Sequence, residues 1–472
     1  MRFRVPGVTV RLKYLIIFPY IRNKKMTSEQ QYIDLFREQR SLIEANSCAL
    51  MNGRRQAAFE DFCRLGFPTR REERYKYTDV AQAFAPDYGL NLRQAAPAPQ
   101  VLARFRCNLP NLSPLVFYVA NDTFSGGAVR ELPRGLHVLS MRQAAGQLPA
   151  DVCAHYGRLA DTAGDALTAL NTMLAQDGVV VYVEAGTVLP DPIQIINLSV
   201  AQADLMSNRR VLVVAEGGTS VKLLFCDHAD NRRRYLTNQV VEVVAGREAA
   251  VEIYSVEETT EQNTRFSNLY VEQQADSRVT LCSVSLHNGL TRNRTDVRLA
   301  GSHASLQAYG AVIADKQQHV DHNILVDHAV ESCHSDLLYK YVLNDRAVGA
   351  FAGKVLVRPG AQHTDSQQTN ANLCASPEAH MYTQPMLEIY ADDVKCNHGS
   401  TVGRFDEQAL FYMCQRGIPE AEARLLLQHA FVNEVLSRIE LEPLRERLAH
   451  LVEMRFRGEL SKCEGCRMCQ HG

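Results

Sequence analysis

Four short apolar runs that recur at regular intervals decide the fold: SVKLLFCD (residues 220–227), AAVEIYSVEE (249–258), RVTLCSVSL (278–286) and ASLQAYG (304–310). Each run follows a turn of small or polar residues, which reads GGT, GRE, ADS and GSH in that order. The strands start 30, 28 and 27 positions apart, at Val221, Val251, Val279 and Leu306. A near-constant period of this size indicates a repeated strand–turn–strand unit whose inner face is buried by the next unit. An all-β solenoid or sandwich fits the pattern, and the regular spacing favours the solenoid.

The β-rich runs extend from Gly178 to about Gly403, and the segments on either side are helical. Before them, Thr27 to about Phe67 has a helical period. After them, a glycine stop and two proline starts indicate successive helices. The predicted fold is therefore mainly β, with a solenoid core between helical regions. The expected divisions are a mixed N-terminal domain (26–165), the core (166–403), a helical C-terminal domain (404–457) and a cysteine-rich tail (458–472).

The first 25 residues differ from the rest because they carry seven basic residues and no acidic one. Pro19 interrupts their apolar stretch and no small-residue cleavage site follows, so they match a signal peptide poorly. Met26 precedes Ser28 and Gln31, which have the spacing of a helix capping box. We therefore expect residues 1–25 to be an extension from an early start codon. Without them the formal charge of the chain falls from −2 to −9.

The composition argues against several functional classes. Hydrophobic residues make up 46% and charged residues 22%, as in ordinary globular proteins, so a disordered, collagen-like or coiled-coil chain is excluded. No run of eighteen apolar residues predicts a membrane helix. A charge of −2 and the lack of tryptophan argue against nucleic-acid binding. The 13 cysteines have no disulfide spacing, and we interpret most of them as reduced, buried thiols of a cytoplasmic protein.

The segment from Gln384 to Ile418 is the most informative for function, since the signatures GxxxxGK[ST], GxGxxG, GxSxG and HExxH are all absent. On a strand, Cys396 and His398 point to one face of the sheet and Asn397 points to the other. A thiol and an imidazole on one face can share a soft metal such as iron or zinc. Two ligands are only half of a tetrahedral site, so a buried cysteine beside a hydrogen-bonded histidine is the other interpretation.

The stretch LEIYADDVKCNHGSTVGRFDEQALFYMCQRGI (387–418) closely resembles a signature of the SufB/SufD family, in its SufD branch, from the SUF iron–sulfur cluster assembly machinery. Tyr75 stands where many relatives have tryptophan, which is a mild departure. The resemblance covers essentially Met26 to about Arg457. Three further segments resemble family elements: LNTMLAQDGVVVYV (170–183), FAGKVLVRPGAQHTDSQQTNANL (351–373) and REERYKYTDV (71–80).

The resemblance implies a right-handed parallel β-helix between helical domains, in agreement with the repeat. It implies a non-catalytic scaffold subunit that pairs with a SufB-like paralogue through the β-helices, while each subunit binds one SufC-like ATPase at its C-terminal helices. The family histidine at that interface is implicated in cluster assembly, and it maps to His398, with Cys396 beside it. The isolated subunit is expected to bind no cofactor tightly and the complex to hold an iron–sulfur cluster transiently. A homodimer in isolation is left open.

The C-terminal helices carry more apolar surface than they need for their own core. The run ALFYM (409–413) is followed by a second helix with an apolar stripe that includes Ala430, Val435 and Ile439. We expect the ATPase to dock on this region. The residues singled out for contact with the ATPase are Leu410, Phe411, Tyr412, Leu425 and Leu426.

The tail SKCEGCRMCQHG (461–472) lies outside the family pattern. Cys463, Cys466 and Cys469 form a CxxCxxC motif, and His471 adds a fourth candidate ligand. Consecutive CxxC spacing lets thiolates converge on one metal ion or cluster. The other interpretation is a chain terminus with three exposed thiols. In either case we expect the tail to be an addition to the assembly site and not the site itself.

Two other functions stand as alternatives to the scaffold subunit. A β-solenoid can be a secreted polysaccharide-active enzyme, although the lack of tryptophan, the poor signal peptide and the many unpaired thiols argue against it. The chain could also work alone as a metal or cluster carrier through its tail. Co-purification from the native host would show whether an ATPase and a paralogue accompany the chain.

Overall fold

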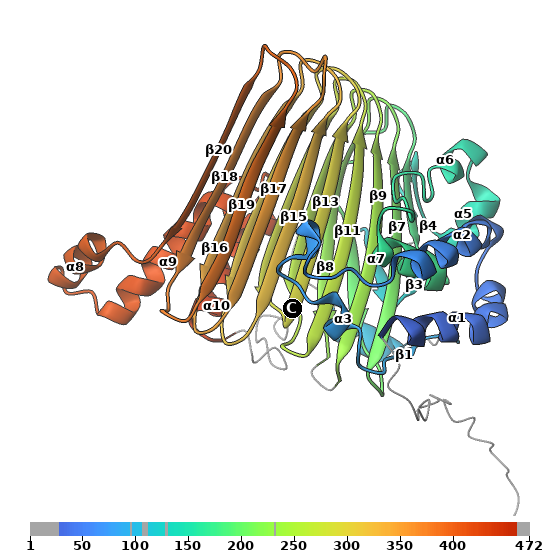
Figure 1. Ribbon diagram of the computed structural model, residues 1–472, viewed down its shortest axis with the longest axis horizontal. Helices are drawn as coiled ribbons and strands as arrows, with labels where there is room; N and C mark the ends of the chain where they lie inside the picture. Colours follow the sequence, from blue (N-terminus) through green and yellow to red (C-terminus); the bar gives the residue numbers. More distant parts are fainter. Residues whose placement is uncertain (1–27, 95–96, 106–111, 128–130, 231–232, 460–472) are drawn as a thin grey trace, which may run out of the picture.

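A computed structural model describes residues 28–459 except 95–96, 106–111, 128–130 and 231–232, and shows a parallel β-solenoid flanked by helices (Figure 1). Consecutive strands of the core alternate between two ten-stranded sheets. Sheet A contains, in spatial order, β4 (Leu136–Ser140), β5 (Val179–Val183), β7 (Leu205–Ala215), β9 (Tyr235–Ala245), β11 (Asn263–Gln273), β13 (Leu290–Leu299), β15 (His319–His328), β17 (Val348–Val357) and β19 (His380–Ile389), with β1 (Gly89–Leu90) beside β7. Sheet B contains β3 (Thr123–Gly127), β2 (Val116–Ala120), β6 (Ile193–Ser199), β8 (Ser220–Ala229), β10 (Ala250–Glu258), β12 (Arg278–His287), β14 (Ser305–Ala314), β16 (His334–Leu343), β18 (Asp365–Cys374) and β20 (Lys395–Gly403).

The register of sheet B confirms the repeat that the sequence predicts. Val221 pairs with Val251, Val251 with Val279, and Val279 with Leu306, so the four strand starts form one column. All four side chains are at most 1% exposed. Burying an aliphatic side chain of this size stabilises the fold by about 1.5–3 kcal/mol. The column therefore accounts for the period in the sequence and forms part of the core between the two sheets.

The turns that precede these strands share a left-handed residue three positions before the strand start. It is Gly218 (φ 69°), Glu248 (61°), Asp276 (60°) and His303 (63°) in successive turns. Glycine adopts this backbone conformation freely, and short polar residues tolerate it better than branched ones do. This requirement explains why the turns contain only small or polar residues, and why the apolar runs between them are so evenly bounded.

Most helices of the N-terminal region lie on or near the outer face of sheet A (Figure 1). Asn171 of α7 (Ala166–Leu174) donates through Nδ2 to the carbonyl oxygens of Arg209 (3.0 Å) and Asn238 (2.8 Å), which fixes the helix on β7 and β9. Glu242 of β9 accepts hydrogen bonds from backbone N–H groups of the loop 157–160. The helices are α1 (Ser28–Ala45), α2 (Ala49–Leu65), the 3₁₀ turn Glu73–Tyr75, α3 (Val80–Ala83), α4 (Pro99–Arg104), α5 (Met141–Gln147), α6 (Ala150–Ala154) and α7 (Ala166–Leu174).

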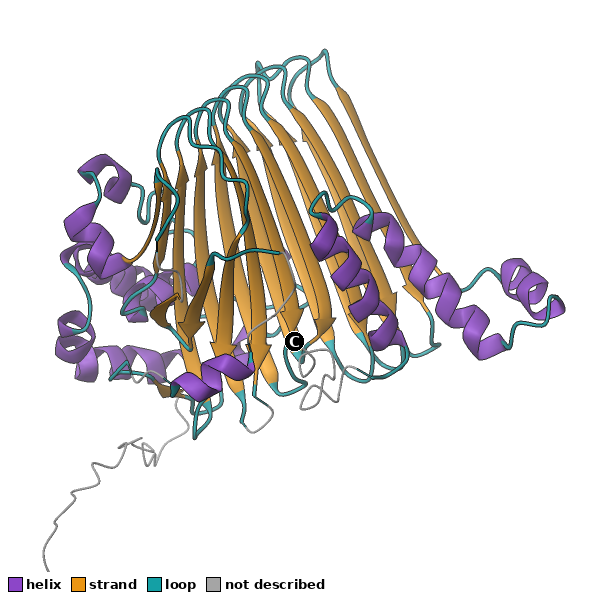
Figure 2. Ribbon diagram, turned by 180° about the vertical axis from the view of Figure 1, so that it is seen from behind, coloured by secondary structure: helices purple, strands orange, loops and turns teal. Residues whose placement is uncertain are grey.

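The C-terminal helices α9 (Glu420–Leu436) and α10 (Glu442–Phe456) lie across the outer face of sheet B, and α8 (Glu407–Gln415) projects away from it (Figure 2). Val432, Val435 and Leu448 belong to one apolar cluster with residues of β8 to β16. The predicted stripe does not lie on one buried face, because Val435 is buried whereas Ala430 is exposed. Apolar residues occupy more than one side of α9, and sheet B covers only one of them. Within the described residues, no helix is long and apolar enough to cross a membrane.

Two histidines are buried between the sheets as hydrogen-bonded neutral groups. His322 Nδ1 lies 2.7 Å from the Tyr341 hydroxyl, and His328 Nε2 lies 2.9 Å from the Ser335 hydroxyl. Burial lowers the pKa of His322 to about 3 and that of His328 to about 4. Both imidazoles are therefore uncharged in the folded chain at neutral pH.

These histidines predict a loss of stability in mild acid. Below about pH 6.5 the unfolded chain binds protons on both imidazoles, whereas the folded chain does not until the lower pKa is reached. Stability should fall as the pH drops from about 6.5 towards 4, by up to about 1.4 kcal/mol per pH unit for each histidine. The urea midpoint measured across this range should depend less on pH in His322→Gln, with His380→Gln as the exposed control. An unchanged pH dependence of stability in His322→Gln would show that His322 is not a buried, neutral imidazole in the folded chain.

Candidate functional site

The solenoid is closed at its N-terminal end and open at its C-terminal end. β3 and β4 pair antiparallel with their neighbours at the closed end. β19 and β20 are the last strands of the two sheets, and no other strand of the described chain pairs with their outer edges (Figure 1). The last turn also exposes four large apolar side chains: Tyr382 (45%), Ile389 (40%), Tyr390 (62%) and Val402 (51%). An unpaired strand edge with exposed apolar groups is a template for another chain.

The inward-facing row of side chains becomes polar just before this open end. In β14 the inward row includes Leu306, Ala308 and Val312, all of them buried in the apolar core. In β18 the corresponding side chains are polar and at most 3% exposed. The open end is therefore lined beneath β20 by hydrogen-bonding groups instead of an apolar core. These residues are Ser366, Gln368, Asn370 and Asn372.

The register of β20 extends the inward row to Cys396 and His398. Cys396 pairs with the buried Ser366, and His398 pairs with the buried Gln368. Asn397, between them, is exposed and pairs with the exposed Gln367. Because side chains alternate along a strand, the thiol and the imidazole share the inward face at the end of the solenoid. This arrangement is the one expected from their spacing in the sequence.

The two groups differ in their surroundings. Cys396 is half-buried and packs in an apolar cluster with Val355, Val357 and Leu387. This burial raises the pKa of the Cys396 thiol, and the nearby Asp365 raises it further. The thiol is therefore protonated at neutral pH and must lose its proton before it can bind a metal. His398 is exposed, so its imidazole is accessible to a ligand or to another chain.

A hydrogen-bond network holds the last strands in place around this site. The Thr383 hydroxyl of β19 lies 2.6 Å from that of Ser400 in β20, and it donates to Oδ1 of Asn370 in β18 (2.8 Å). Asn372 Nδ2 donates to the carbonyl oxygen of Thr401 (2.8 Å). The network connects β18, β19 and β20 and fixes the strand that carries Cys396 and His398.

Cys396 and His398 are two candidate ligands and not a complete metal site. Across the described part of the chain, no group of three histidine, cysteine or acidic side chains is arranged to hold a metal ion. A tetrahedral site with thiolate and imidazole ligands requires two more donors. Any metal bound here would thus take its remaining ligands from outside this group of residues.

The N-terminal segment of residues 70–78, here called the strap, crosses the outer face of sheet A towards the open end (Figure 1). Arg74 forms an ion pair with Asp296 of β13 (2.7 Å), and the Thr78 hydroxyl donates to Asp321 of β15 (2.6 Å). The ring of Tyr77 stacks on that of Tyr382 in β19 at 4.6 Å. The strap therefore reaches the last strand of sheet A. Sequence reasoning recognised this segment as a family element but did not predict these contacts.

Tyr75 anchors the strap to a buried carboxylate. Its hydroxyl donates to Asp165 at 2.5 Å, and Arg294 pairs with the same carboxylate at 2.7 Å. Burial favours the neutral form of Asp165, but Arg294 and the hydrogen bonds outweigh that effect and lower the pKa of Asp165 below its usual value. This carboxylate is therefore charged at neutral pH. Loss of any of its hydrogen-bond donors would leave a buried charge without one of its stabilising partners.

We expect Tyr75→Phe to destabilise the chain by about 1–3 kcal/mol, because it leaves a buried, charged acceptor short of one donor. Tyr77→Phe is the matched control, since it keeps the ring that stacks on Tyr382 and removes only a half-buried hydroxyl. Urea unfolding at pH 7 measures both effects. Equal midpoints for the two variants would show that the Tyr75–Asp165 contact does not hold the strap.

The second group of residues singled out by the sequence lies on and beside α8. Phe411 is 66% exposed, Tyr412 59% and Leu426 44%, and we call these three residues the α8 surface. Leu425 is partly buried, and Leu410 is only 6% exposed, so neither adds much to this surface. An aromatic-rich patch on a projecting helix pair is typical of a protein–protein contact.

The remaining predicted sites lie outside the described residues. These are Cys463, Cys466, Cys469 and His471 of the tail, and the extension of residues 1–25.

Comparison with known proteins shows which family the chain matches. Residues 198–431 match the family described as SUF system FeS cluster assembly, SufBD core domain, and residues 26–195 match the SufBD protein N-terminal region. An iron–sulfur cluster assembly SufBD family protein of Synechocystis is 28% identical over 440 residues, which cover 89% of this chain and 94% of the relative. The assembly protein SufD of Escherichia coli is 34% identical over 37% of this chain and 42% of its own length. SufD of Bacillus subtilis is 25% identical over 62% of this chain and 67% of its own.

Proposed function

The chain belongs to the SufBD family of iron–sulfur cluster assembly proteins, and from that premise we propose that it is a non-catalytic subunit of the SUF scaffold. In this proposal the chain pairs through its open end with a SufB-like paralogue and binds a SufC-like ATPase on the α8 surface. Iron and sulfide are the cargo that the complex assembles into a cluster. The observation that carries the proposal is the unfinished last turn of the solenoid, with Cys396 and His398 on its inward face.

Pairing at the open end would supply hydrogen bonds to the unpaired strand edges and would bury exposed apolar side chains. The outer edges of β19 and β20 have backbone groups without a neighbouring strand in the described chain, and a partner strand or solenoid end can supply their hydrogen bonds. The same contact buries Tyr390 and Val402, which are 62% and 51% exposed. A strand-edge contact with large apolar side chains is the kind of interface that remains stable in an obligate complex.

His398 is the residue that we propose acts on the cargo at this interface. Its imidazole is exposed at the end of the inward row, where it can bind iron through one ring nitrogen or accept a proton. Cys396 is protonated in its apolar surroundings. It becomes a ligand only when iron displaces the thiol proton to solvent, or when a basic group of the partner accepts that proton. The paralogue would supply the donors that the chain itself lacks.

The α8 surface is suited to bind an ATPase that exerts force on the solenoid. It lies on a helix pair that projects from the solenoid beyond its last strands (Figures 1 and 2), and its three apolar residues are exposed. An ATPase bound there could exert force on sheet B through α9, whose residues pack directly on that sheet. Nucleotide hydrolysis by the partner would thus reach the scaffold without any phosphate-binding loop in this chain.

We also propose a cytoplasmic location. The nine cysteines that lie in the described ranges are all free thiols. Thiols persist in this state in reducing compartments.

Pairing at the open end predicts a double substitution that removes the paralogue from the chain but leaves the ATPase bound. In Tyr390→Glu combined with Val402→Glu, two charges would be buried in the contact, so the chain should lose the paralogue but retain the ATPase. Val188→Glu is the matched control, because Val188 is an exposed valine (68%) near the closed end. Affinity purification of the tagged chain with both partners co-expressed measures the outcome. Retention of the paralogue by the double variant would contradict pairing at the open end.

A further inference from the structure

The strap carries an aromatic side chain to the last strand of sheet A. The Thr78 hydroxyl donates to Asp321 of β15. The neighbouring Tyr77 stacks on Tyr382 of β19, with ring centroids 4.6 Å apart and ring planes 16° from parallel. In register, Asp321 pairs with Ala350, and Ala350 pairs with Tyr382. The segment of the strap between these two contacts therefore passes over Ala350 of β17.

Tyr77 fills the space above Ala350 and supports one face of the Tyr382 ring. Ala350 faces outward, because side chains alternate along β17 and its neighbour Phe351 lies in the core between the sheets. Ala350 is nevertheless fully buried, at 0% exposure. The ring of Tyr77 consequently lies on the β17 side of Tyr382. Stacked rings attract each other, so Tyr77 holds the ring of Tyr382 in one orientation.

The opposite face of the Tyr382 ring is turned towards the open end. β19 has no neighbouring strand beyond it in the described chain, and Tyr382 remains 45% exposed despite its contact with Tyr77. A strand that pairs with the outer edge of β19 would lie about 4.8 Å away. A side chain on that strand, at the position opposite Tyr382, would lie against the free face of the ring.

The open end is suited to a partner of one particular shape. It presents two strand edges at once, β19 with ten residues and β20 with nine. The two edges belong to facing sheets, which pack about 10 Å apart. A single peptide strand covers only one such edge. The end of a second solenoid presents two edges with the same spacing, and so it covers both.

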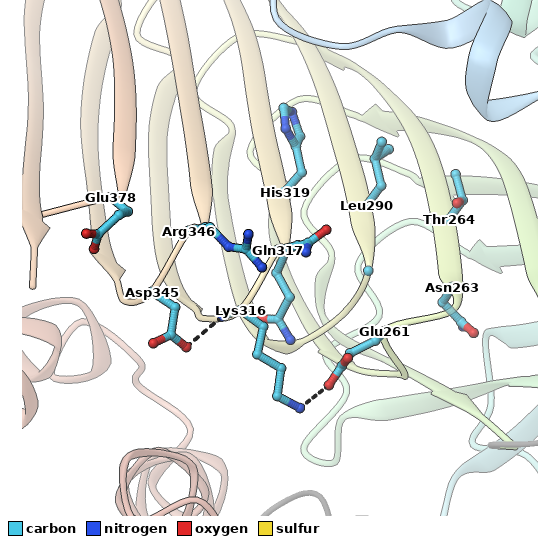
Figure 3. A pocket seen from close by; sticks show the side chains of 12 residues that line it. Glu261, Asn263, Thr264, Leu290, Lys316, Gln317, His319, Asp345, Arg346 and Glu378 are labelled. Atoms are coloured by element: carbon cyan, nitrogen blue, oxygen red, sulfur yellow. Dashed lines mark hydrogen bonds and ion pairs between the residues drawn. The ribbon is translucent and has the colours of Figure 1, made fainter. Parts of the chain in front are cut away.

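Charged side chains border this surface at the rim of the solenoid. Figure 3 shows Arg346 and Glu378 in the turns before β17 and β19, along a groove of about 950 Å³. Both side chains are exposed. In specific interfaces, aromatic anchors lie at the centre and charged groups lie at the rim, where each of them contributes little affinity. Glu378 is therefore a rim residue with which Tyr382 can be compared.

We propose that Tyr382 is an anchor of the contact with the SufB-like paralogue, and that Tyr77 of the strap is its positioning residue. The partner is the end of a second solenoid, whose edge strand pairs with β19 and places a planar or aliphatic side chain on the free face of Tyr382. The N-terminal region thus takes part in pairing, although most of its helices lie towards the closed end (Figure 1). This inference rests on the proposed pairing at the open end and adds the strap to it.

A double-mutant cycle tests whether Tyr77 acts through Tyr382. The Kd of the purified paralogue for the immobilised full-length chain should rise about thirtyfold in Tyr382→Ala, the size expected for an aromatic anchor. It should rise about tenfold in Tyr77→Ala. The double variant should bind no more weakly than Tyr382→Ala alone, because Tyr77 then has no ring to position. Tyr77→Phe keeps the stacked ring and should bind like the wild-type chain.

Two controls separate this contact from general effects of substitution. Tyr182→Ala removes a half-buried tyrosine that stacks on His137 near the closed end, and it should leave the Kd unchanged. Glu378→Ala removes a rim charge and should change the Kd by less than about threefold.

The outcomes distinguish this inference from the proposed function. A wild-type chain that binds no paralogue would overturn the proposed pairing and this inference with it. Normal binding by the wild-type chain, with an equal Kd in Tyr382→Ala, would overturn the inference alone, as would additive losses in the double variant. If Tyr382→Ala abolished a homodimer in sedimentation and left the Kd of the paralogue unchanged, the surface would belong to a second copy of this chain and the inference would be wrong.

Discussion

Phe411→Asp combined with Tyr412→Asp is expected to abolish co-purification of the ATPase. The two rings are 66% and 59% exposed on α8, and large aromatic side chains of this kind carry most of the binding free energy of an interface. Removing two such anchors and burying two charges instead should weaken the contact by at least about 4 kcal/mol, or roughly a thousandfold in Kd. Because neither ring packs in the described core, the variant should fold like the wild-type chain.

The matched control for this experiment is Leu42→Asp, since Leu42 is an exposed apolar residue (39%) on α1, remote from α8. Pull-down of the ATPase by the tagged chain, with circular dichroism to check folding, measures the effect. Truncation after Gly403 would be a poorer test, because α9 and α10 bury the outer face of sheet B and their removal would destabilise the core. Wild-type recovery of the ATPase by the double variant would exclude the α8 surface as the docking site.

His398→Ala is expected to leave the complex intact and to lower the yield of cluster on it by at least about tenfold, the size of effect found when a group that supports a metal is removed. An exposed imidazole contributes little packing, so the change in stability should stay within about 0.5 kcal/mol. Iron and acid-labile sulfide, determined on the purified complex, measure the effect together with its visible absorbance.

Asn397→Ala provides a close control for this prediction. Asn397 is the exposed neighbour of His398 on the same strand, and its side chain points to the opposite face of the sheet. We expect wild-type cluster yield in this variant. If both variants lose cluster yield equally, the loss results from disturbing the strand and not from removing the imidazole. An undiminished yield in His398→Ala would remove His398 from the site.

The solenoid could be predicted from the sequence because its turns repeat a local requirement. Each turn needs a residue with a left-handed backbone three positions before an inward aliphatic residue, and Gly218, Glu248, Asp276 and His303 meet that requirement. The shared face of Cys396 and His398 was predictable for a similar reason, since it depends only on alternation along a strand. The polar inward row of β18 was also visible in DSQQTNANL (365–373), whose alternate residues are all polar.

Contacts between distant parts of the chain could not be predicted in this way. The strap meets β13, β15 and β19 through pairs separated by more than 200 residues, such as Arg74 with Asp296, and no local pattern encodes such pairs. The stripe on α9 was misjudged because its apolar residues surround the helix, so that only the position of sheet B decides which of them are buried. For the same reason Leu410 was grouped with the exposed Phe411 and Tyr412.

The composition of the complex in the native host tests whether the chain is a subunit of a SUF scaffold. The full-length chain carrying an affinity tag should be purified under gentle conditions, and the intact assembly weighed by native mass spectrometry with its subunits identified. We expect one copy of this chain, one SufB-like paralogue and two copies of a SufC-like ATPase. Recovery of the chain alone, or only as a homodimer, from cells that contain both partners would contradict it.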